Sequence, residues 1–172
     1  MSGEGPVGAR RYPRRHAGAK LGLQLRLDRE VAMQFETTVE IDAAPEYVWD
    51  VMSDVERWPE WTASVQRVER LEDGPLQVGS RARLKQPKFP PTVWEVTDVD
   101  PGRSFSWNNK SVGLTSVGHH RVVPRPVGGA TVALALRQSG PLAPLLGILT
   151  SRLSQRYVET EAQGLKRRCE TQ

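Results

Sequence analysis

The chain has 172 residues, enough for one domain with a substantial core, and 38% of them are hydrophobic. Its formal net charge of +4 is concentrated at the amino end. Residues 1–32 contain seven Lys and Arg against three acids, whereas residues 33–172 contain seventeen of each. The remainder of the chain is therefore nearly neutral, which argues against a nucleic-acid-binding face on a folded domain there.

Cys169 is the single cysteine, which excludes an intramolecular disulfide and a cysteine-based metal cluster. The three histidines, His16, His119 and His120, lack the spacing of a metal site, and we expect neither a metal nor a cofactor. No apolar run approaches the roughly 20 residues of a membrane span. No cleaved export signal is expected, so a cytoplasmic location is the default prediction.

The composition divides the chain into a tail, residues 1–32, and a domain, residues 33–172. Residues 1–20 are rich in Gly, Pro and Arg and are expected to be disordered. The tail's arginines could contact an anionic surface weakly, although a solvated tail is the simpler interpretation. Met33 stands directly before the first clear strand, and translation starting there is a second hypothesis. The sequence does not separate a monomer from a homodimer.

The domain begins with an alternating segment, residues 35–41, that predicts a β-strand. Asp42-Ala-Ala-Pro45 then predicts a helix start, with Pro45 in the first turn. A second short helical stretch is expected over residues 54–61, where Pro59 prevents a long helix.

From residue 64 the apolar period changes to two, which predicts six further strands. The breaks between them contain Gly, Pro and Asp, as turns require. Short connections between successive strands favour an antiparallel meander. The predicted strands are residues 65–71, 80–85, 92–99, 104–109, 115–123 and 131–138.

A long helix closes the chain, beginning after Gly140-Pro141 and running to about residue 168. Its predicted apolar face recurs every three to four residues. A sheet with one apolar face needs a cover, and only this helix is long enough to provide it. The predicted face consists of Leu142, Leu146, Leu149, Leu153 and Tyr157.

This order of elements and several local motifs resemble the SRPBCC (START-like) superfamily, specifically its polyketide cyclase/dehydrase branch. The motifs include residues 39–49, Trp58-Pro-Glu-Trp61, residues 95–103 and residues 140–146, and the resemblance covers roughly residues 34–169. It implies an α+β helix-grip fold, in which a curved antiparallel sheet of about seven strands wraps around the C-terminal helix. It also implies a pocket for lipids, hormones or polyketides between sheet and helix. Members share a fold more than a reaction.

Strand alternation assigns the side chains that would face this pocket. On residues 115–123, the side that contains Val122 also contains Ser116, Gly118 and His120, so His120 is expected to point inward and His119 outward. The small residues at 116 and 118 would leave volume that a packed core would fill. The predicted ligand-binding residues are Trp58, Trp61, Leu84, Trp94, Phe105, Trp107, Ser116, His120, Leu134, Leu136, Leu149, Leu153 and Tyr157.

The sequence contains no complete catalytic constellation, and two hypotheses about function stay open. The first is binding of a hydrophobic small molecule such as a polyketide, lipid, quinone or aromatic metabolite, driven by burial of its apolar surface. The second is a cyclase or dehydratase in which His120 or Tyr157 transfers a proton. His120 could also be a buried histidine satisfied by a neighbour, and the tryptophans could be plain core.

Overall fold

The computed structural model describes residues 31–171, and the first strand begins at Val31, two residues before the predicted domain boundary. The predictions for residues 1–30 lie outside the described residues. Every strand and helix expected after them is present, with ends that coincide with the predicted ones or differ by up to four residues. Such shifts are usual, because alternation marks the middle of an element better than its ends.

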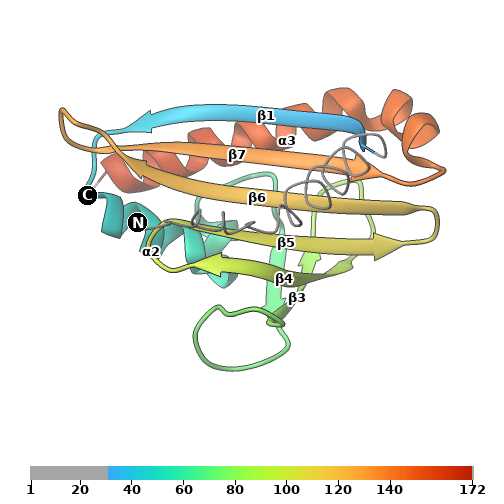
Figure 1. The fold of residues 1–172 in the computed structure, drawn as a ribbon, viewed down its shortest axis with the longest axis horizontal. Helices are drawn as coiled ribbons and strands as arrows, with labels where there is room; N and C mark the ends of the chain where they lie inside the picture. Colours follow the sequence, from blue (N-terminus) through green and yellow to red (C-terminus); the bar gives the residue numbers. More distant parts are fainter. Residues whose placement is uncertain (1–30, 172) are drawn as a thin grey trace, which may run out of the picture. The chain divides into compact units, whose positions relative to one another are not determined.

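Seven strands form one antiparallel sheet, in the order β1-β7-β6-β5-β4-β3-β2 (Figure 1). The first and last strands along the chain pair with each other, Phe35 facing Leu136, while the other strands form a meander. The bounds are β1 Val31–Ile41, β2 Arg67–Arg70, β3 Arg81–Lys85, β4 Thr92–Asp100, β5 Ser104–Ser111, β6 Leu114–Pro124 and β7 Ala130–Ser139.

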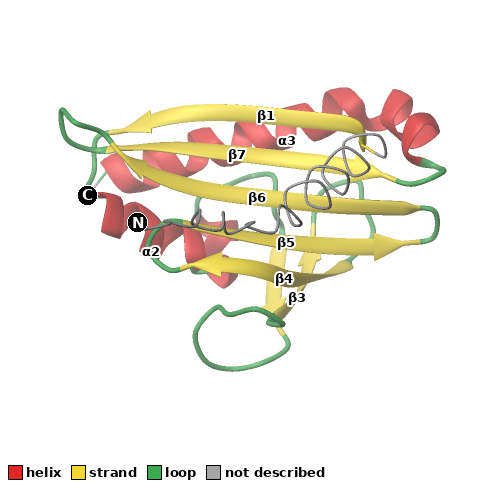
Figure 2. Ribbon diagram, in the orientation of Figure 1, coloured by secondary structure: helices red, strands yellow, loops and turns green. Residues whose placement is uncertain are grey.

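The helices lie on one side of the sheet, behind the strands in Figure 2. α2 (Pro45–Ser53) begins with its proline in the first turn, and η1 (Val55–Glu60) is a 3₁₀ helix that contains Pro59. The long helix α3 (Ala143–Glu170) contacts β1 and β7. None of the helices in the described part of the chain has the length and apolar character needed to cross a membrane.

The core fills the end of the fold where α2, η1 and the second half of α3 meet the sheet. Ile41, Val48, Phe105 and Leu165 are fully buried there, and Trp58 is 1% exposed with its indole N–H donating to the carbonyl oxygen of Met52 at 3.0 Å. The predicted helix-grip fold is confirmed. The core does not fill the space between the sheet and the first half of α3.

The predicted apolar face of α3 is only partly correct, because Leu146 and Tyr157 line the cavity whereas Leu142 and Leu149 do not. Leu142 and Leu149 are 41% and 73% exposed, so they point to solvent. The other residues of α3 that line the cavity are smaller or more polar, with Thr150, Ser154 and Val158 at helical spacing. A spacing of three to four residues identifies a face of a helix, but α3 carries leucines on both faces, and the spacing does not tell which one is covered.

Candidate functional site

A cavity of about 420 Å³ lies between the concave face of the sheet and the first half of α3. Its size is within the range of small-molecule sites. The wall is predominantly apolar, with polar groups at intervals. It contains five aromatic side chains from five parts of the chain: Trp58 on η1, Phe89 on the β3–β4 loop, Trp94 on β4, Trp107 on β5 and Tyr157 on α3.

Three tryptophans form a continuous aromatic wall on one side of the cavity. The ring of Trp107 lies 5.2 Å from that of Trp94 and 5.2 Å from that of Trp58, measured between centroids. Trp107 fits because the residue opposite it on β6 is Gly118, where a Cβ atom would lie 2.6 Å from the indole Nε1. Glycine at 118 therefore admits a large flat side chain beside the open volume.

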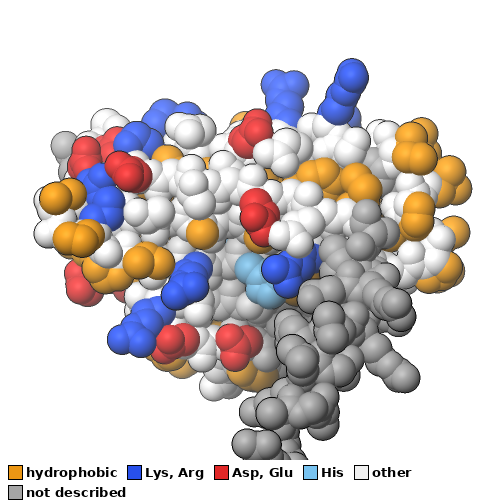
Figure 3. Space-filling model, turned by 45° about the horizontal axis from the view of Figure 1, so that its top comes forward, with side chains coloured by type: hydrophobic (Ala, Val, Ile, Leu, Met, Phe, Trp, Pro, Cys, Tyr) orange, Lys and Arg blue, Asp and Glu red, His pale blue; other side chains and the backbone are white. Residues whose placement is uncertain are grey.

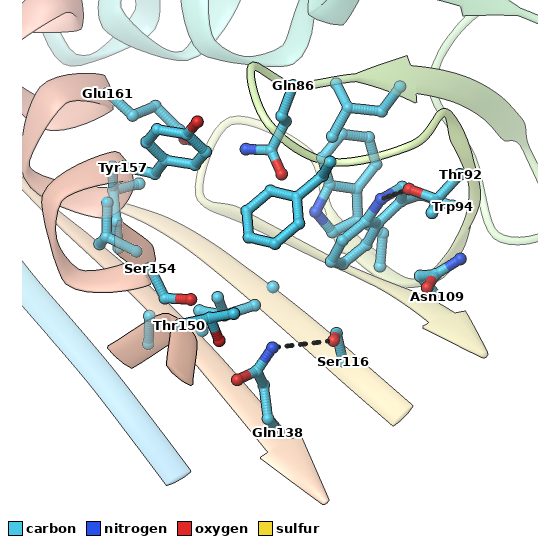
Figure 4. A pocket seen from close by; sticks show the side chains of 18 of the residues that line it. Gln86, Thr92, Trp94, Asn109, Ser116, Gln138, Thr150, Ser154, Tyr157 and Glu161 are labelled. Carbon is cyan, nitrogen blue, oxygen red and sulfur yellow. Dashed lines mark hydrogen bonds between the residues drawn. The ribbon is translucent and has the colours of Figure 1, made fainter. Parts of the chain in front are cut away.

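A row of polar side chains crosses the sheet one step further along the strands (Figure 4). Asn109 pairs with Ser116, and Ser116 pairs with Gln138, so the three lie side by side on β5, β6 and β7. The Gln138 amide donates to Ser116 Oγ at 3.4 Å, and the Asn109 amide donates to the Val93 carbonyl at 2.7 Å. The side-chain oxygens of Asn109 and Gln138 can accept hydrogen bonds from a ligand. Thr150, on α3, faces this row (Figure 4).

The other end of the cavity contains a histidine–carboxylate pair. His120 Nε2 and Glu161 Oε1 are 3.0 Å apart, and the two side chains are 6% and 14% exposed. The imidazole stacks flat on Phe105, with ring centroids 4.3 Å apart and planes 4° from parallel. Its Nδ1 is buried and has no hydrogen-bond partner within residues 31–171. The ring is thus held in place by stacking on one face and by the carboxylate at one edge.

The β3–β4 loop is tied to α3 across the cavity. The Tyr157 hydroxyl donates to the Pro87 carbonyl, and the Tyr157 ring packs edge-on against Phe89 at 5.9 Å. Burial raises the pKa of the Tyr157 phenol, which favours the protonated form that donates this hydrogen bond. Lys85 Nζ, at the end of β3, donates to the Phe89 carbonyl in the same loop. These contacts make the loop part of the cavity wall.

Nine of the thirteen predicted ligand-binding residues lie in the cavity wall and four lie outside it. Phe105 is fully buried beneath His120, and Trp61 packs against the outer side of Trp58. Leu149 is exposed on the opposite face of α3 and Leu153 lies at the side of that helix. The nine in the wall are Trp58, Leu84, Trp94, Trp107, Ser116, His120, Leu134, Leu136 and Tyr157.

Several wall residues were missed by the sequence interpretation, and Glu161 is the most important of them. It follows Tyr157 by four residues, so it lies on the same helical face, and this spacing was the available signal. Asn109 and Gln138 likewise follow predicted inward residues by two positions. Strand alternation was therefore the available signal for both. No comparable signal identifies the loop residues Phe89 and Pro90.

No group of three His, Cys, Asp or Glu side chains between residues 31 and 171 could hold a metal ion. His119 was expected on the opposite side of the strand from His120. Its Nδ1 forms a hydrogen bond with Ser106 Oγ, and the two atoms are 2.9 Å apart. Burial, together with the nearby Arg137 guanidinium, lowers the pKa of His119. The polar side chains of the cavity wall include His120, Glu161, Tyr157 and several amide and hydroxyl groups.

A family model described as polyketide cyclase/dehydrase and lipid transport matches residues 32–170. Similar solved structures include a START superfamily protein from Mycobacterium smegmatis, with a TM-score of 0.66 and 19% identity over 79% of this chain and 96% of that one. An aromatase/cyclase from a Streptomyces species has a TM-score of 0.60 and 20% identity over 81% and 96% of the two chains. A Thermus thermophilus protein has a TM-score of 0.66 and 20% identity over 80% and 97%. Among curated proteins, none matches the sequence.

Proposed function

The chain belongs to the polyketide cyclase/dehydrase and lipid-transport family, and from this premise we propose that it binds a hydrophobic, partly aromatic small molecule between its sheet and α3. One observation carries the proposal. The interior keeps a cavity of about 420 Å³ beside an aromatic wall, where a structural core would be packed solid.

The driving force would be removal of ligand apolar surface from water. At about 25 cal/mol per Å², burying roughly 200 Å² of apolar surface contributes about 5 kcal/mol before the cost of immobilising the ligand. The tryptophan rings favour a flat ligand, since aromatic surfaces stack. The polar row at Asn109, Ser116 and Gln138 and the His120–Glu161 pair would orient its oxygen or nitrogen atoms at the two ends.

The neutral fluorescent amine N-phenyl-1-naphthylamine tests this proposal, because its emission rises in an apolar site and it carries one N–H donor. We expect saturable binding that Leu136→Trp weakens at least tenfold, because the larger side chain occupies the cavity. Leu149→Trp is the matched control, since it introduces the same side chain on the exposed face of α3 and should leave affinity unchanged. Equal affinity for both variants would show that the probe binds elsewhere.

A second candidate function, a cyclase or dehydratase, is favoured by the His120–Glu161 pair alone. A base at this position could take a proton from a carbon next to a carbonyl while a neighbouring acid protonates a departing hydroxyl. The geometry favours binding over this chemistry, because His120 Nδ1 is buried and Nε2 is occupied by Glu161. Proton transfer to a ligand would require the pair to open.

One variant, His120→Ala, distinguishes binding from catalysis. If the protein binds without catalysis, His120→Ala should bind N-phenyl-1-naphthylamine within a fewfold of the unaltered chain, and mass spectrometry should find a co-purified apolar ligand chemically unchanged after incubation. Turnover of a cyclisable poly-β-carbonyl substrate that His120→Ala abolishes without weakening its binding would establish the enzyme instead.

A further inference from the structure

Five large apolar side chains are exposed together at the end of the molecule where α3 begins. Val112, in the β5–β6 turn, is 93% exposed, and Ile148, on α3, is 79% exposed. The turn and the helix start are in contact, because the Leu142 backbone N–H donates to the Gly113 carbonyl at 2.9 Å. Figure 3 shows hydrophobic side chains gathered at this end. We call this set the apolar end patch: Val112, Leu142, Leu145, Ile148 and Leu149.

The patch lies on the outer face of the helix whose inner face lines the cavity. Leu142, Leu145, Ile148 and Leu149 are three or four residues apart or adjacent, and therefore form one stripe. Leu146 and Thr150, on the other side of the same turns, belong to the cavity wall. A surface that covered the patch would thus lie within one helix diameter of the cavity.

The charged residues nearest the patch in sequence are cations, and the first acid on the same helical face is Glu159, three residues after Arg156. Residues 108–114 and 137–158 contain four cations, Lys110, Arg137, Arg152 and Arg156, and no Asp or Glu. Arg152 and Arg156 are exposed and continue the stripe of Leu145 and Leu149 along α3, and Lys110 is exposed two residues before Val112. Exposed apolar side chains with Lys and Arg close by favour binding at the interface of an anionic membrane, because apolar burial and attraction to lipid phosphates add.

We propose that the apolar end patch docks onto an anionic lipid bilayer, so that the protein exchanges its hydrophobic ligand at a membrane surface. Insertion of the apolar side chains would supply the hydrophobic part of the binding, and Lys110, Arg152 and Arg156 would pair with lipid phosphates. Only the exchange of a ligand rests on the proposed function. Docking onto the membrane does not require a bound ligand.

Vesicle co-sedimentation of the full chain tests the docking, with phosphatidylcholine vesicles compared with vesicles that contain about 30% phosphatidylglycerol. We expect binding to the anionic vesicles that declines with added salt. Val112→Glu combined with Ile148→Glu should reduce it about tenfold or more. The control is Val78→Glu combined with Val127→Glu, which makes the same change of charge at exposed valines in the β2–β3 and β6–β7 loops and should bind as the unaltered chain does.

Three results would overturn the proposal. The first is failure of the full chain to bind anionic vesicles at low salt. The second is equal binding by both double variants, which would assign the binding to the basic residues 1–32. The third is a concentration-dependent dimer that the Val112/Ile148 variant abolishes, without vesicle binding, which would make the patch an interface between two copies. Binding of N-phenyl-1-naphthylamine is measured without vesicles. Failure of membrane docking therefore leaves the proposed ligand binding standing, and failure of ligand binding leaves the docking standing.

Discussion

Trp107 lies across Gly118, its indole Nε1 only 2.6 Å from the position a Cβ atom at residue 118 would take. Gly118→Ala should force this ring toward the cavity or away from β6. We expect a loss of about 1–3 kcal/mol in the free energy of unfolding, typical of overpacking, and weaker probe binding. Urea denaturation and fluorescence titration measure the two effects. Unchanged stability with unchanged binding would mean that the ring is not confined between β6 and the cavity.

The Tyr157–Pro87 hydrogen bond should slow ligand release. Tyr157→Phe removes the donor and keeps the ring against Phe89, so the β3–β4 loop loses one tie to α3 while the wall stays apolar. We expect a small loss of stability, about 0.5–1.5 kcal/mol, and a severalfold faster dissociation of N-phenyl-1-naphthylamine in stopped-flow displacement. Tyr47→Phe, on α2 outside the cavity, is the control. An unchanged dissociation rate would exclude the loop from the exit path.

The two faces of α3 should respond differently to truncation. Leu165 is fully buried against the core, so Leu165→Ala should cost about 2–5 kcal/mol in the free energy of unfolding. Leu149, at 73% exposure, should lose less than about 0.5 kcal/mol on the same change. Urea denaturation of both variants checks this. A large loss at Leu149 would restore the original prediction that it faces the sheet.

Cys169 should be chemically inert in the native protein. It is 4% exposed, and burial raises the pKa of its thiol from 9.0 to about 11. The thiolate is the reactive form, so we expect slow reaction with Ellman's reagent at pH 8 and rapid reaction in denaturant. Because the folded-state pKa is raised, the stabilisation due to the neutral thiol is fully present below about pH 9. It declines as the pH rises toward 11. Rapid labelling of the native chain at pH 8 would contradict this burial.

The sequence predicted the order and type of the elements because the relevant patterns are local. Alternation through residues 115–123 placed His120 inward, and Asp42-Ala-Ala-Pro45 located the start of α2. The position of α3 relative to the sheet is not local. Leu149 and Thr150 are adjacent in sequence, and only packing decides that the threonine faces the cavity and the leucine faces solvent.

The candidate site was predicted where it follows from strand alternation and missed where it depends on other contacts. Trp94, Trp107 and Leu136 follow from a period of two. The His120–Glu161 pair joins residues 41 positions apart, and the Tyr157–Pro87 bond joins residues 70 positions apart. Asn109 and Gln138 share the inward side of their strands with Trp107 and Leu136 but were not predicted, although a ligand cavity needs polar groups to orient its occupant.

A crystal structure of the protein with N-phenyl-1-naphthylamine tests the central claim most directly. The account predicts ligand density between the sheet and α3, in contact with the indoles of Trp94 and Trp107, at the volume that the unliganded protein leaves open. Density confined to the outer surface, with these side chains closed over a solid interior, would contradict it.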